Sequence, residues 1–314
     1  MLDLSVIIVN WNACHFLRRC LVSVFAESAD LAIEVLVVDN ASHDDSLQML
    51  ATEFPRVAVI ANTENVGFAA ANNQGIERAG GRYVVLLNPD TEIIDKALVK
   101  MVNYLDQHPS VGIVGPKLIL PDGIIQGGAA GYDPSPATLF AYAFMLHSLF
   151  PHRVRSLWLA KESYESPQIN VDWVAGACLM VRALAIQGVG LMDTSYFMYA
   201  EDIEWCHRIK KAGWRIVCLS FATVIHHVGG STRQRGHRFV GQNIRGLDTY
   251  YRSRYSGPTV FLLHLCGVIG FSLRTVAYQS LRWFSDDKKH TELALTMWEC
   301  TKSSLGFLIR SFVA

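Results

Sequence analysis

The sequence lacks an excess of charge of either sign and lacks a paired-cysteine motif. Lys and Arg together number 28, and so do Asp and Glu, so the chain carries no overall positive charge of the kind that binds nucleic acid. Its seven cysteines include no C-x-x-C pair, and their odd number does not suggest a disulfide framework. We therefore expect a protein that folds in a reducing cytosol.

Long apolar runs are also missing. The run from Leu4 to Val9 follows an Asp and stops at Asn10, which is too short for a signal peptide. Residues 259–273 are apolar, but this run falls short of the roughly 20 residues that span a bilayer. An interfacial or packed amphipathic helix is therefore expected there, rather than a membrane span.

What the sequence does have is an alternation of two patterns. Hydrophobic residues make up 51% of the 314-residue chain, and short apolar runs predict strands at 5–9, 34–38, 57–60 and 83–87. Helical patterns lie between and after them, at 16–25, 42–50, 68–79 and 96–108. Ser42 and Asp45 resemble a capping box at the start of the second helix. The alternation predicts an α/β fold with a parallel sheet covered on both faces.

Polar residues follow the predicted strands, at the edge where such sheets bind ligands. They are Asn10, Asn12, Asp39, Asn88 and Asp90. The carboxylate of Asp39 can accept hydrogen bonds from a base or a ribose, or it can close a turn before the next helix. In Asn88-Pro89-Asp90 the proline restrains the backbone, and the carboxylate can bind a hard divalent cation. The same tripeptide is also typical of an ordinary turn.

Three features in the second half carry chemistry. An aromatic stretch leads into Glu201 and Asp202 at the start of a predicted helix, where they can serve catalysis or simply favour a helix N-terminus. His226 ends an apolar strand beside a second His, and it is a metal ligand or a structural residue. Arg233 belongs to a Gly-flanked loop that either closes over a diphosphate or is a solvated basic loop.

Seven segments occur in one order and together resemble the family 2 glycosyltransferases, in particular the bacterial rhamnosyltransferase-like branch. The resemblance covers about residues 4–235. The segments are VIIVNWN, VVDNAS, NVGFAAANNQG, LLNPDTE, DWVAGACLMVRA, YAEDIEWCHRIKKAGW and VIHHVGGST.

This resemblance implies a GT-A fold over residues 1–240, followed by a C-terminal helical appendage at 241–314. It implies inverting transfer of a sugar from a nucleotide-diphospho-sugar, with dTDP-rhamnose suggested by the branch. The acceptor would be a saccharide or a lipid-linked glycan in cell-surface polysaccharide synthesis, at the cytoplasmic face of the cell membrane. The appendage would contact the membrane, cover the sheet or form a dimer interface.

The resemblance also implies roles for individual residues. Asp202 would be the catalytic base, and Asp39 would bind the nucleoside. Asp90 and His226 would hold Mg²⁺ or Mn²⁺, while Asn88 stands where the usual D-x-D pattern has its first Asp. The other expected donor and acceptor contacts are Asn10, Asn12, Asn65, Trp173, Gly176, Glu201 and Arg233.

Three other classes of protein stay in view. A dinucleotide-dependent oxidoreductase needs G-x-G-x-x-G after its first strand, and residues 10–13 read Asn-Trp-Asn-Ala. A nucleotidyltransferase would share the nucleotide site but release pyrophosphate. A non-catalytic carbohydrate-binding protein would have no need of the Glu201-Asp202 pair.

Overall fold

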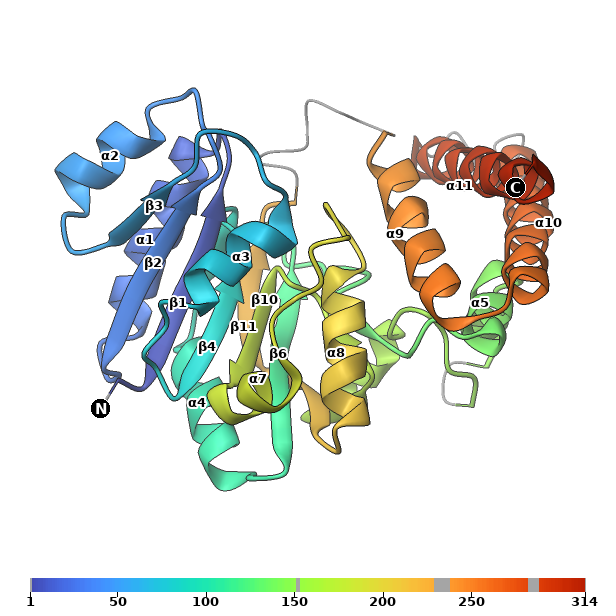
Figure 1. The fold of residues 1–314 in the computed structure, drawn as a ribbon. Coiled ribbons are helices and arrows are strands. Elements are labelled where there is room, and N and C mark those ends of the chain that lie inside the picture. Colours follow the sequence, from blue (N-terminus) through green and yellow to red (C-terminus); the bar gives the residue numbers. More distant parts are fainter. Residues whose placement is uncertain (1, 151–152, 229–237, 282–287, 314) are drawn as a thin grey trace. The chain divides into compact units, whose positions relative to one another are not determined.

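The computed structural model describes residues 2–150, 153–228, 238–281 and 288–313 (Figure 1). Contacts divide the chain into two compact units. The first, called the α/β unit, is made of Met1–Gly131, Lys161–Phe197 and Glu201–Gln234. The second, called the helical unit, is made of Tyr132–Ala160, Met198–Ala200 and Arg235–Ala314. Residues 132–160 thus group with the C-terminal helices, and the division at residue 240 stays a prediction.

The α/β unit is built on a nine-stranded sheet. Its strands are β1 (Leu4–Asn10), β2 (Ile33–Asp39), β3 (Ala58–Ala61), β4 (Tyr83–Leu87), β5 (Thr91–Ile93), β6 (Val111–Ile119), β8 (Gln168–Val171), β10 (Cys178–Arg182) and β11 (Arg215–His226). Their order is β3-β2-β1-β4-β10-β6-β11-β5, and β8 pairs with β11. A separate pair joins β7 (Ala130–Gly131) to β9 (Trp173–Val174).

The expected parallel sheet is confirmed for the four strands predicted in the first part of the chain, and the complete sheet is mixed. β1 to β4 are parallel to one another, but β10 runs antiparallel to both β4 and β6. β9 ends at Val174 and β10 begins at Cys178, so residues 175–177 separate the two strands. Since β10 runs against β4, its first residues lie beside the carboxyl end of β4, with Cys178 opposite Leu87.

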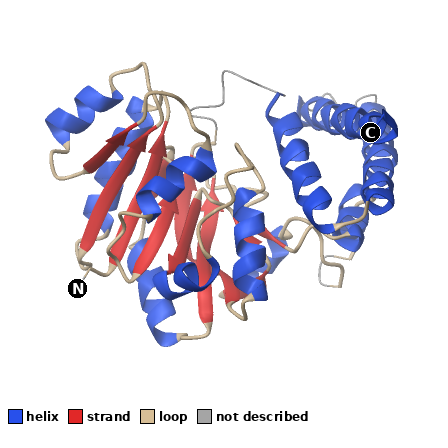
Figure 2. Cartoon of the chain, in the orientation of Figure 1, coloured by secondary structure: helices blue, strands red, loops and turns tan. Residues whose placement is uncertain are grey.

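Helices cover both faces of the sheet (Figure 2). In the α/β unit they are α1 (Cys14–Glu27), α2 (Ser46–Glu53), α3 (Phe68–Ile76), α4 (Ala97–Gln107), α7 (Ala183–Val189) and α8 (Glu201–Lys211), with a short 3₁₀ helix at Lys161–Glu165. Side chains of β1 alternate between the two faces: Val6 and Ile8 join the cluster around α1, while Ile7 meets Gly75 of α3. Both sets are buried, which explains why β1 reads as a continuous apolar run.

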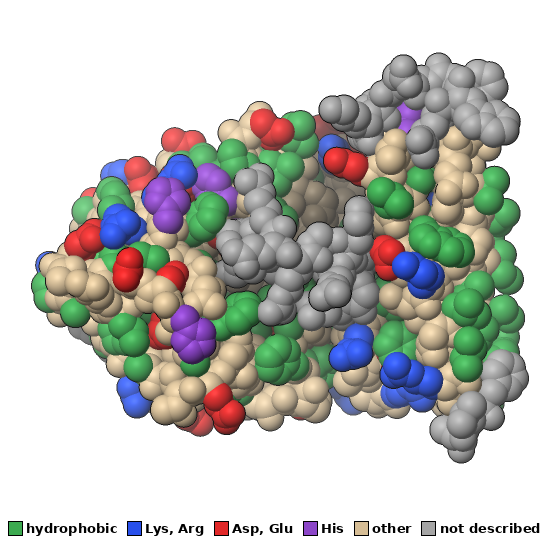
Figure 3. Space-filling view, turned by 90° about the horizontal axis from the view of Figure 1, so that it is seen from above, with side chains coloured by type: hydrophobic (Ala, Val, Ile, Leu, Met, Phe, Trp, Pro, Cys, Tyr) green, Lys and Arg blue, Asp and Glu red, His purple; other side chains and the backbone are tan. Residues whose placement is uncertain are grey.

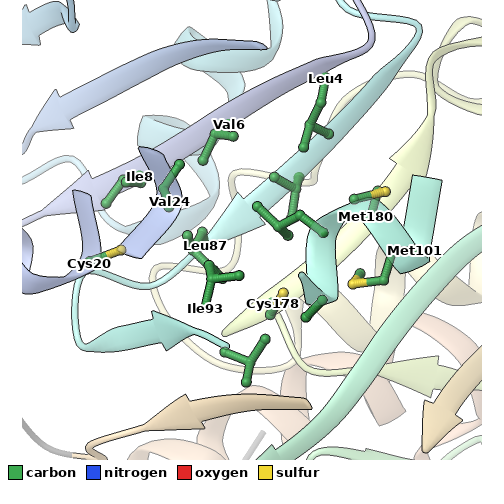
Figure 4. Packing of buried hydrophobic residues seen from close by; sticks show 14 of the residues in the cluster. Leu4, Val6, Ile8, Cys20, Val24, Leu87, Ile93, Met101, Cys178 and Met180 are labelled. Carbon is green, nitrogen blue, oxygen red and sulfur yellow. The ribbon is translucent and has the colours of Figure 1, made fainter. Parts of the chain in front are cut away.

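The main core lies between the sheet, α1 and α4. Figure 4 shows Val6, Ile8 and Leu87 of the sheet packed with Val24 of α1 and Met101 of α4. All five are 2% exposed or less, so the strand ends that leave this core are held on a rigid base.

The predicted capping box is wrong. α2 begins at Ser46 with Asp45 as its N-cap, and no side-chain hydrogen bond caps it. The Ser42 hydroxyl instead accepts from the backbone N–H of Asn12, at 2.9 Å between N and Oγ. The Ser42 side chain thus bonds the segment that follows β1 and does not cap α2.

The helical unit contains α5 (Pro136–Ala143), α6 (Leu146–Leu149), α9 (Arg238–Arg254), α10 (Gly257–Leu281) and α11 (Lys288–Val313). α10 extends the predicted apolar run to 25 residues. By length and composition it is the one helix among the described residues that is able to cross a membrane, although 39% of its apolar window is buried. One face packs inward through residues such as Leu263 and Phe271.

The opposite face of α10 is apolar and exposed. We call it the α10 outer face; it consists of Leu262, Ile269, Leu273 and Val276. Their spacing of seven, four and three residues keeps these side chains on one stripe of the helix. Figure 3 shows hydrophobic side chains along the right-hand edge, on the side where both α10 and α11 lie in Figure 1.

Candidate active site

The carboxyl ends of β1 and β2 form a bonded polar corner. Asn10 and Asp39 are paired in the sheet register, and Nδ2 of Asn10 donates to Oδ2 of Asp39 at 2.9 Å. The other carboxylate oxygen of Asp39 accepts from the backbone N–H of Ser42, also at 2.9 Å. Asn12, with φ of 51°, accepts from the backbone N–H of His43 at 2.7 Å. Asp39 therefore holds this corner together by hydrogen bonds. Each of its carboxylate oxygens can accept a further hydrogen bond, such as one from a nucleoside.

Asn65 belongs to a neighbouring amide network. Its Oδ1 accepts from Nδ2 of Asn40 at 2.9 Å and from the backbone N–H of Gly67 at 3.0 Å. Gly67 has φ of +88°, and a Cβ there would lie 2.7 Å from the carbonyl oxygen of Phe197, so the position requires glycine. The next residue, Phe68, donates its backbone N–H to that same oxygen at 2.8 Å. The loop is thus held on the segment that leads toward Glu201 and Asp202.

Asp90 and His226, 136 residues apart in the sequence, lie together. Nε2 of His226 is 3.1 Å from Oδ1 of Asp90, and both residues are 7% exposed. Nδ2 of Asn88 lies 3.4 Å from the same Nε2, and Nδ1 of His226 lies 2.8 Å from Oε1 of Gln126. The pair meets because β11 runs antiparallel to β5, which places His226 opposite Thr91.

The two adjacent histidines point to different partners. His227 pairs with Glu92, and its ring lies 5.5 Å from the ring of Phe16 between centroids. Since neighbouring side chains of a strand point to opposite faces, only one His of the two can meet Asp90. That residue is His226, as expected from the motif.

This donor set fits a hard divalent cation in part. Within the described residues, no group of three or more His, Cys, Asp and Glu side chains could hold a metal ion. One carboxylate and one imidazole are nevertheless a usual protein share for Mg²⁺ or Mn²⁺ when a diphosphate and water complete the ligands. Asp90 and His226 would hold such an ion.

Asp202 is anchored at the N-terminus of α8. Its Oδ2 accepts from the backbone N–H of Gly176 at 2.9 Å, and its Oδ1 accepts from that of Ile203 at 2.8 Å. Burial raises the pKa of Asp202, and these hydrogen bonds oppose the rise. A fixed carboxylate with a raised pKa is suited to take a proton from a hydroxyl group.

Glu201 is buried more deeply than Asp202. Its side chain is 4% exposed, and its Oε2 has no hydrogen-bond partner among the described residues. Burial, with a further contribution from the charge of Asp202, raises its pKa well above the ordinary value. We therefore expect Glu201 to stay protonated under conditions in which Asp202 is ionised.

A short backbone path joins the two acidic positions. Asn88, at the end of β4, donates its backbone N–H to the carbonyl oxygen of Ala177 at 3.0 Å. The preceding residue, Gly176, is the donor to Asp202. A Cβ on Gly176 would lie 3.1 Å from the ring of Phe68, so a larger residue would press on the loop or on Asp202. The end of β4 and the start of α8 are thus held to the same short segment.

Two expected contacts stay predictions. Trp173 is buried in β9 and is 4% exposed. Arg233 lies outside the described residues. Gln126 and Ser42 were not expected; Gln126 belongs to none of the seven quoted segments, and Ser42 was read only as a cap.

Comparison with known proteins agrees with this geometry. The family model described as "Glycosyl transferase family 2" matches residues 5–122, which include the β1, β2 and β4 corners. Residues 5–122 therefore resemble a family 2 glycosyltransferase domain. The predicted enzyme class is therefore confirmed: the protein is a glycosyltransferase.

Relatives of the family 2 domain extend the likeness over most of the chain. An N-acetylglucosaminyl-diphospho-decaprenol L-rhamnosyltransferase of Mycobacterium tuberculosis is 28% identical over 265 residues, which are 81% of this chain and 85% of that protein. A low-salt glycan biosynthesis hexosyltransferase of Haloferax volcanii is 27% identical over 230 residues, covering 72% of this chain and 67% of the relative.

A solved structure confirms the predicted GT-A fold. A mannosyltransferase from Pyrobaculum calidifontis, in complex with GDP-Man and Mn²⁺, superposes with a TM-score of 0.62 at 16% identity. The superposition covers 98% of this chain and 89% of that one. At this identity the likeness speaks for the fold alone.

Proposed function

We propose that this glycosyltransferase moves a sugar from a nucleotide-diphospho-sugar to a lipid-linked glycan with inversion at the anomeric carbon, and that dTDP-rhamnose is its donor. One observation carries the proposal: the Asp90–His226 pair and Asp202 are tied to the adjacent ends of β4 and β10 through Asn88 and Gly176. Such a site has one carboxylate for the donor diphosphate and another for the acceptor.

The chemistry follows from the residues. Asp202 takes the proton of the acceptor hydroxyl as this oxygen attacks the anomeric carbon from the side opposite the leaving group, and one displacement inverts the configuration. Asp90 and His226 would hold a divalent cation, which would supply positive charge where the leaving nucleoside diphosphate gains negative charge. Asp39 and Asn65 hold the polar corner in which we place the nucleoside.

The rhamnosyl donor and the lipid-linked acceptor are supported by the name of the mycobacterial relative. A panel of labelled nucleotide sugars, each incubated with a prenyl-diphosphate-linked acceptor, tests both. We expect label from dTDP-rhamnose in the lipid fraction, together with dTDP as the second product. Release of pyrophosphate would instead indicate a nucleotidyltransferase, and binding without turnover of any donor would indicate a carbohydrate-binding protein.

The metal requirement is proposed separately. EDTA should abolish transfer, and Mn²⁺ or Mg²⁺ should restore it, because the two protein ligands need a cation to bind the diphosphate. Full transfer in chelator would contradict this part of the proposal without affecting the assignment of Asp202.

We also propose that the α10 outer face rests on a lipid surface, where a lipid-linked acceptor is found. The only Lys, Arg, Asp or Glu of α10 is Arg274, whose Nη1 donates to the carbonyl oxygen of Tyr142 at 3.1 Å within the helical unit. The four residues of the α10 outer face thus present an uncharged apolar stripe.

Flotation with anionic phospholipid vesicles tests this contact. The double variant Leu273→Ser and Val276→Ser should float several-fold less than the parent protein. Leu184→Ser is the matched control, because Leu184 is as exposed as those residues but lies on α7 of the α/β unit. Equal flotation of the double variant and the parent would refute the contact.

A further inference from the structure

The side chain of Gln126 forms a hydrogen bond with Nδ1 of His226, the ring nitrogen farther from Asp90. Its Oε1 lies 2.8 Å from Nδ1, while Nε2 on the other side of the ring faces Asp90. A side-chain carbonyl oxygen only accepts hydrogen bonds, so Nδ1 of His226 must be the nitrogen that carries the proton. Nε2, the other ring nitrogen, lies 3.4 Å from Nδ2 of Asn88.

This tautomer has a consequence at Asp90. The hydrogen bond to Gln126 occupies Nδ1, so Nε2 is the ring nitrogen left to bind a cation, and Oδ1 of Asp90 lies 3.1 Å from it. Two ligands of one divalent cation lie at about this separation, so the pair is placed to share one ion.

Backbone bonds hold Gln126 in place. The chain turns after β6 at Gly123, which has φ of +83°, and then returns along the strand it has left. Ile119 and Ile125 form an antiparallel bridge, and the N–H of Gln126 donates to the carbonyl oxygen of Leu118 at 2.9 Å. The side chain of Gln126 thus starts from a hairpin that is fixed to the sheet.

We propose that Gln126 is a positioning residue of the metal site: it fixes the ring orientation and tautomer of His226, so that the Nε2 lone pair is presented to a divalent cation shared with Asp90. The inference rests on the proposed metal role of Asp90 and His226. Partners of this kind change metal affinity by about 10–100-fold when they are removed.

The test measures Mn²⁺ binding to the full-length protein. Binding is monitored as the decrease in the EPR signal of free Mn²⁺. The titration is made first with Mn²⁺ alone and then with dTDP, whose oxygens complete the ligand set. Gln126→Leu should raise the Mn²⁺ dissociation constant about 10–100-fold. Gln126→Glu keeps an acceptor beside Nδ1, so its dissociation constant should equal that of the parent or be lower.

Three controls make the result decisive. Gln107→Leu makes the same chemical change on an exposed position of α4 and should leave Mn²⁺ binding unchanged. Thermal melting should be equal for Gln126→Leu and Gln126→Glu, which excludes a general loss of structure. Gln126→Leu with parental affinity, or Gln126→Glu as weak as Gln126→Leu, would overturn the inference.

His226→Ala separates this inference from the proposed function. If His226→Ala weakens Mn²⁺ binding and Gln126→Leu does not, only the role of Gln126 fails. If His226→Ala itself leaves Mn²⁺ binding unchanged, the proposed metal site fails, and the role of Gln126 fails with it.

Discussion

A carboxylate and a histidine meet in each of the two units, and their surroundings differ. In the α/β unit, Asp90 and His226 have the amides of Asn88 and Gln126 beside them. In the helical unit, Nε2 of His264 lies 2.7 Å from Oδ1 of Asp248.

Asp248 has a permanent cation beside it. Nε of Arg252 donates to both of its carboxylate oxygens, at 3.0 and 2.9 Å. Burial alone would raise the pKa of Asp248, but the hydrogen bonds from His264 and Arg252 hold it below the ordinary value. The ring of His264 also stacks on Phe307, with centroids 5.4 Å apart.

The comparison shows that residue type does not separate a ligand site from a structural ion pair. In the helical unit, Arg252 neutralises the carboxylate of Asp248, so this pair forms a structural ion-pair network. The pair at the sheet edge has the amides of Asn88 and Gln126 beside its imidazole, and its cation-binding role is our proposal.

The largest effect is expected at the sheet edge. Asp202→Asn should lower turnover by about 10²–10⁴-fold, because the amide cannot take the proton of the acceptor hydroxyl. Donor binding, measured by calorimetry, should be retained. Asp30→Asn is the matched control, since the Asp30 side chain is 58% exposed and forms an ion pair with Lys96 at the surface. If Asp202→Asn kept a near-native turnover, Asp202 would not be the catalytic base.

The second effect compares the two carboxylate–histidine pairs directly. Asp248→Asn should lower the free energy of unfolding by about 1.5–3 kcal/mol, because two charge-assisted hydrogen bonds are lost inside the helical unit. It should leave Mn²⁺ binding unchanged. Asp90→Asn should do the reverse, weakening Mn²⁺ binding with little loss of stability. Denaturant unfolding measures the stability of both variants, and EPR titration measures their Mn²⁺ affinity. Equal changes in stability and in affinity for the two variants would contradict the proposed difference between the pairs.

The third effect is a pH dependence of stability that arises from Glu201. Because the pKa of Glu201 is raised in the folded protein, the folded state keeps a proton that the unfolded chain has already released. The contribution of this group to the free energy of unfolding is greatest below the ordinary pKa of Glu. It falls as the pH rises toward the raised pKa. Glu201→Gln cannot titrate, so its melting temperature relative to the parent should rise between about pH 5 and pH 8. A constant difference over that range would contradict the protonated state.

The smallest effect is expected on the α10 outer face. Leu273→Ser should change the free energy of unfolding by less than about 0.5 kcal/mol, because the Leu273 side chain is 58% exposed. Chemical denaturation of the variant in the absence of lipid measures this. A loss of 2 kcal/mol or more, the range for buried leucines, would show that this face is covered within the protein itself.

The predictable part of the fold is local. The runs at 5–9, 34–38 and 83–87 became β1, β2 and β4 because a strand buried on both faces must be apolar at every position. The helix of Glu201 and Asp202 was also expected, with Gly213 at φ of +95° just past its end. The polar corners of Asp39 and Asn88 followed from where those strands stop.

Other features could not be read locally. The direction of β10 depends on how residues 132–177 leave the sheet and return to it, and local pattern does not encode that path. The apolar run 259–273 ends at Arg274, but α10 continues to Leu281, and Arg274 lies over the ring of Tyr142, at 4.9 Å from its centroid, within the helical unit. A charge that ends an apolar run in the sequence is thus accommodated by packing.

By itself, the sequence determined which residues can do chemistry: acids and amides at strand ends, an acidic pair at a helix start and two histidines at the end of a strand. Only the tertiary structure decided which of them meet. Sheet pairing places His226 rather than His227 at Asp90, and the hairpin after β6 adds Gln126 on the far side of the ring. The physical reason is that hydrogen bonds and ligand sets act over about 3 Å, whereas a sequence pattern reports neighbours along the chain.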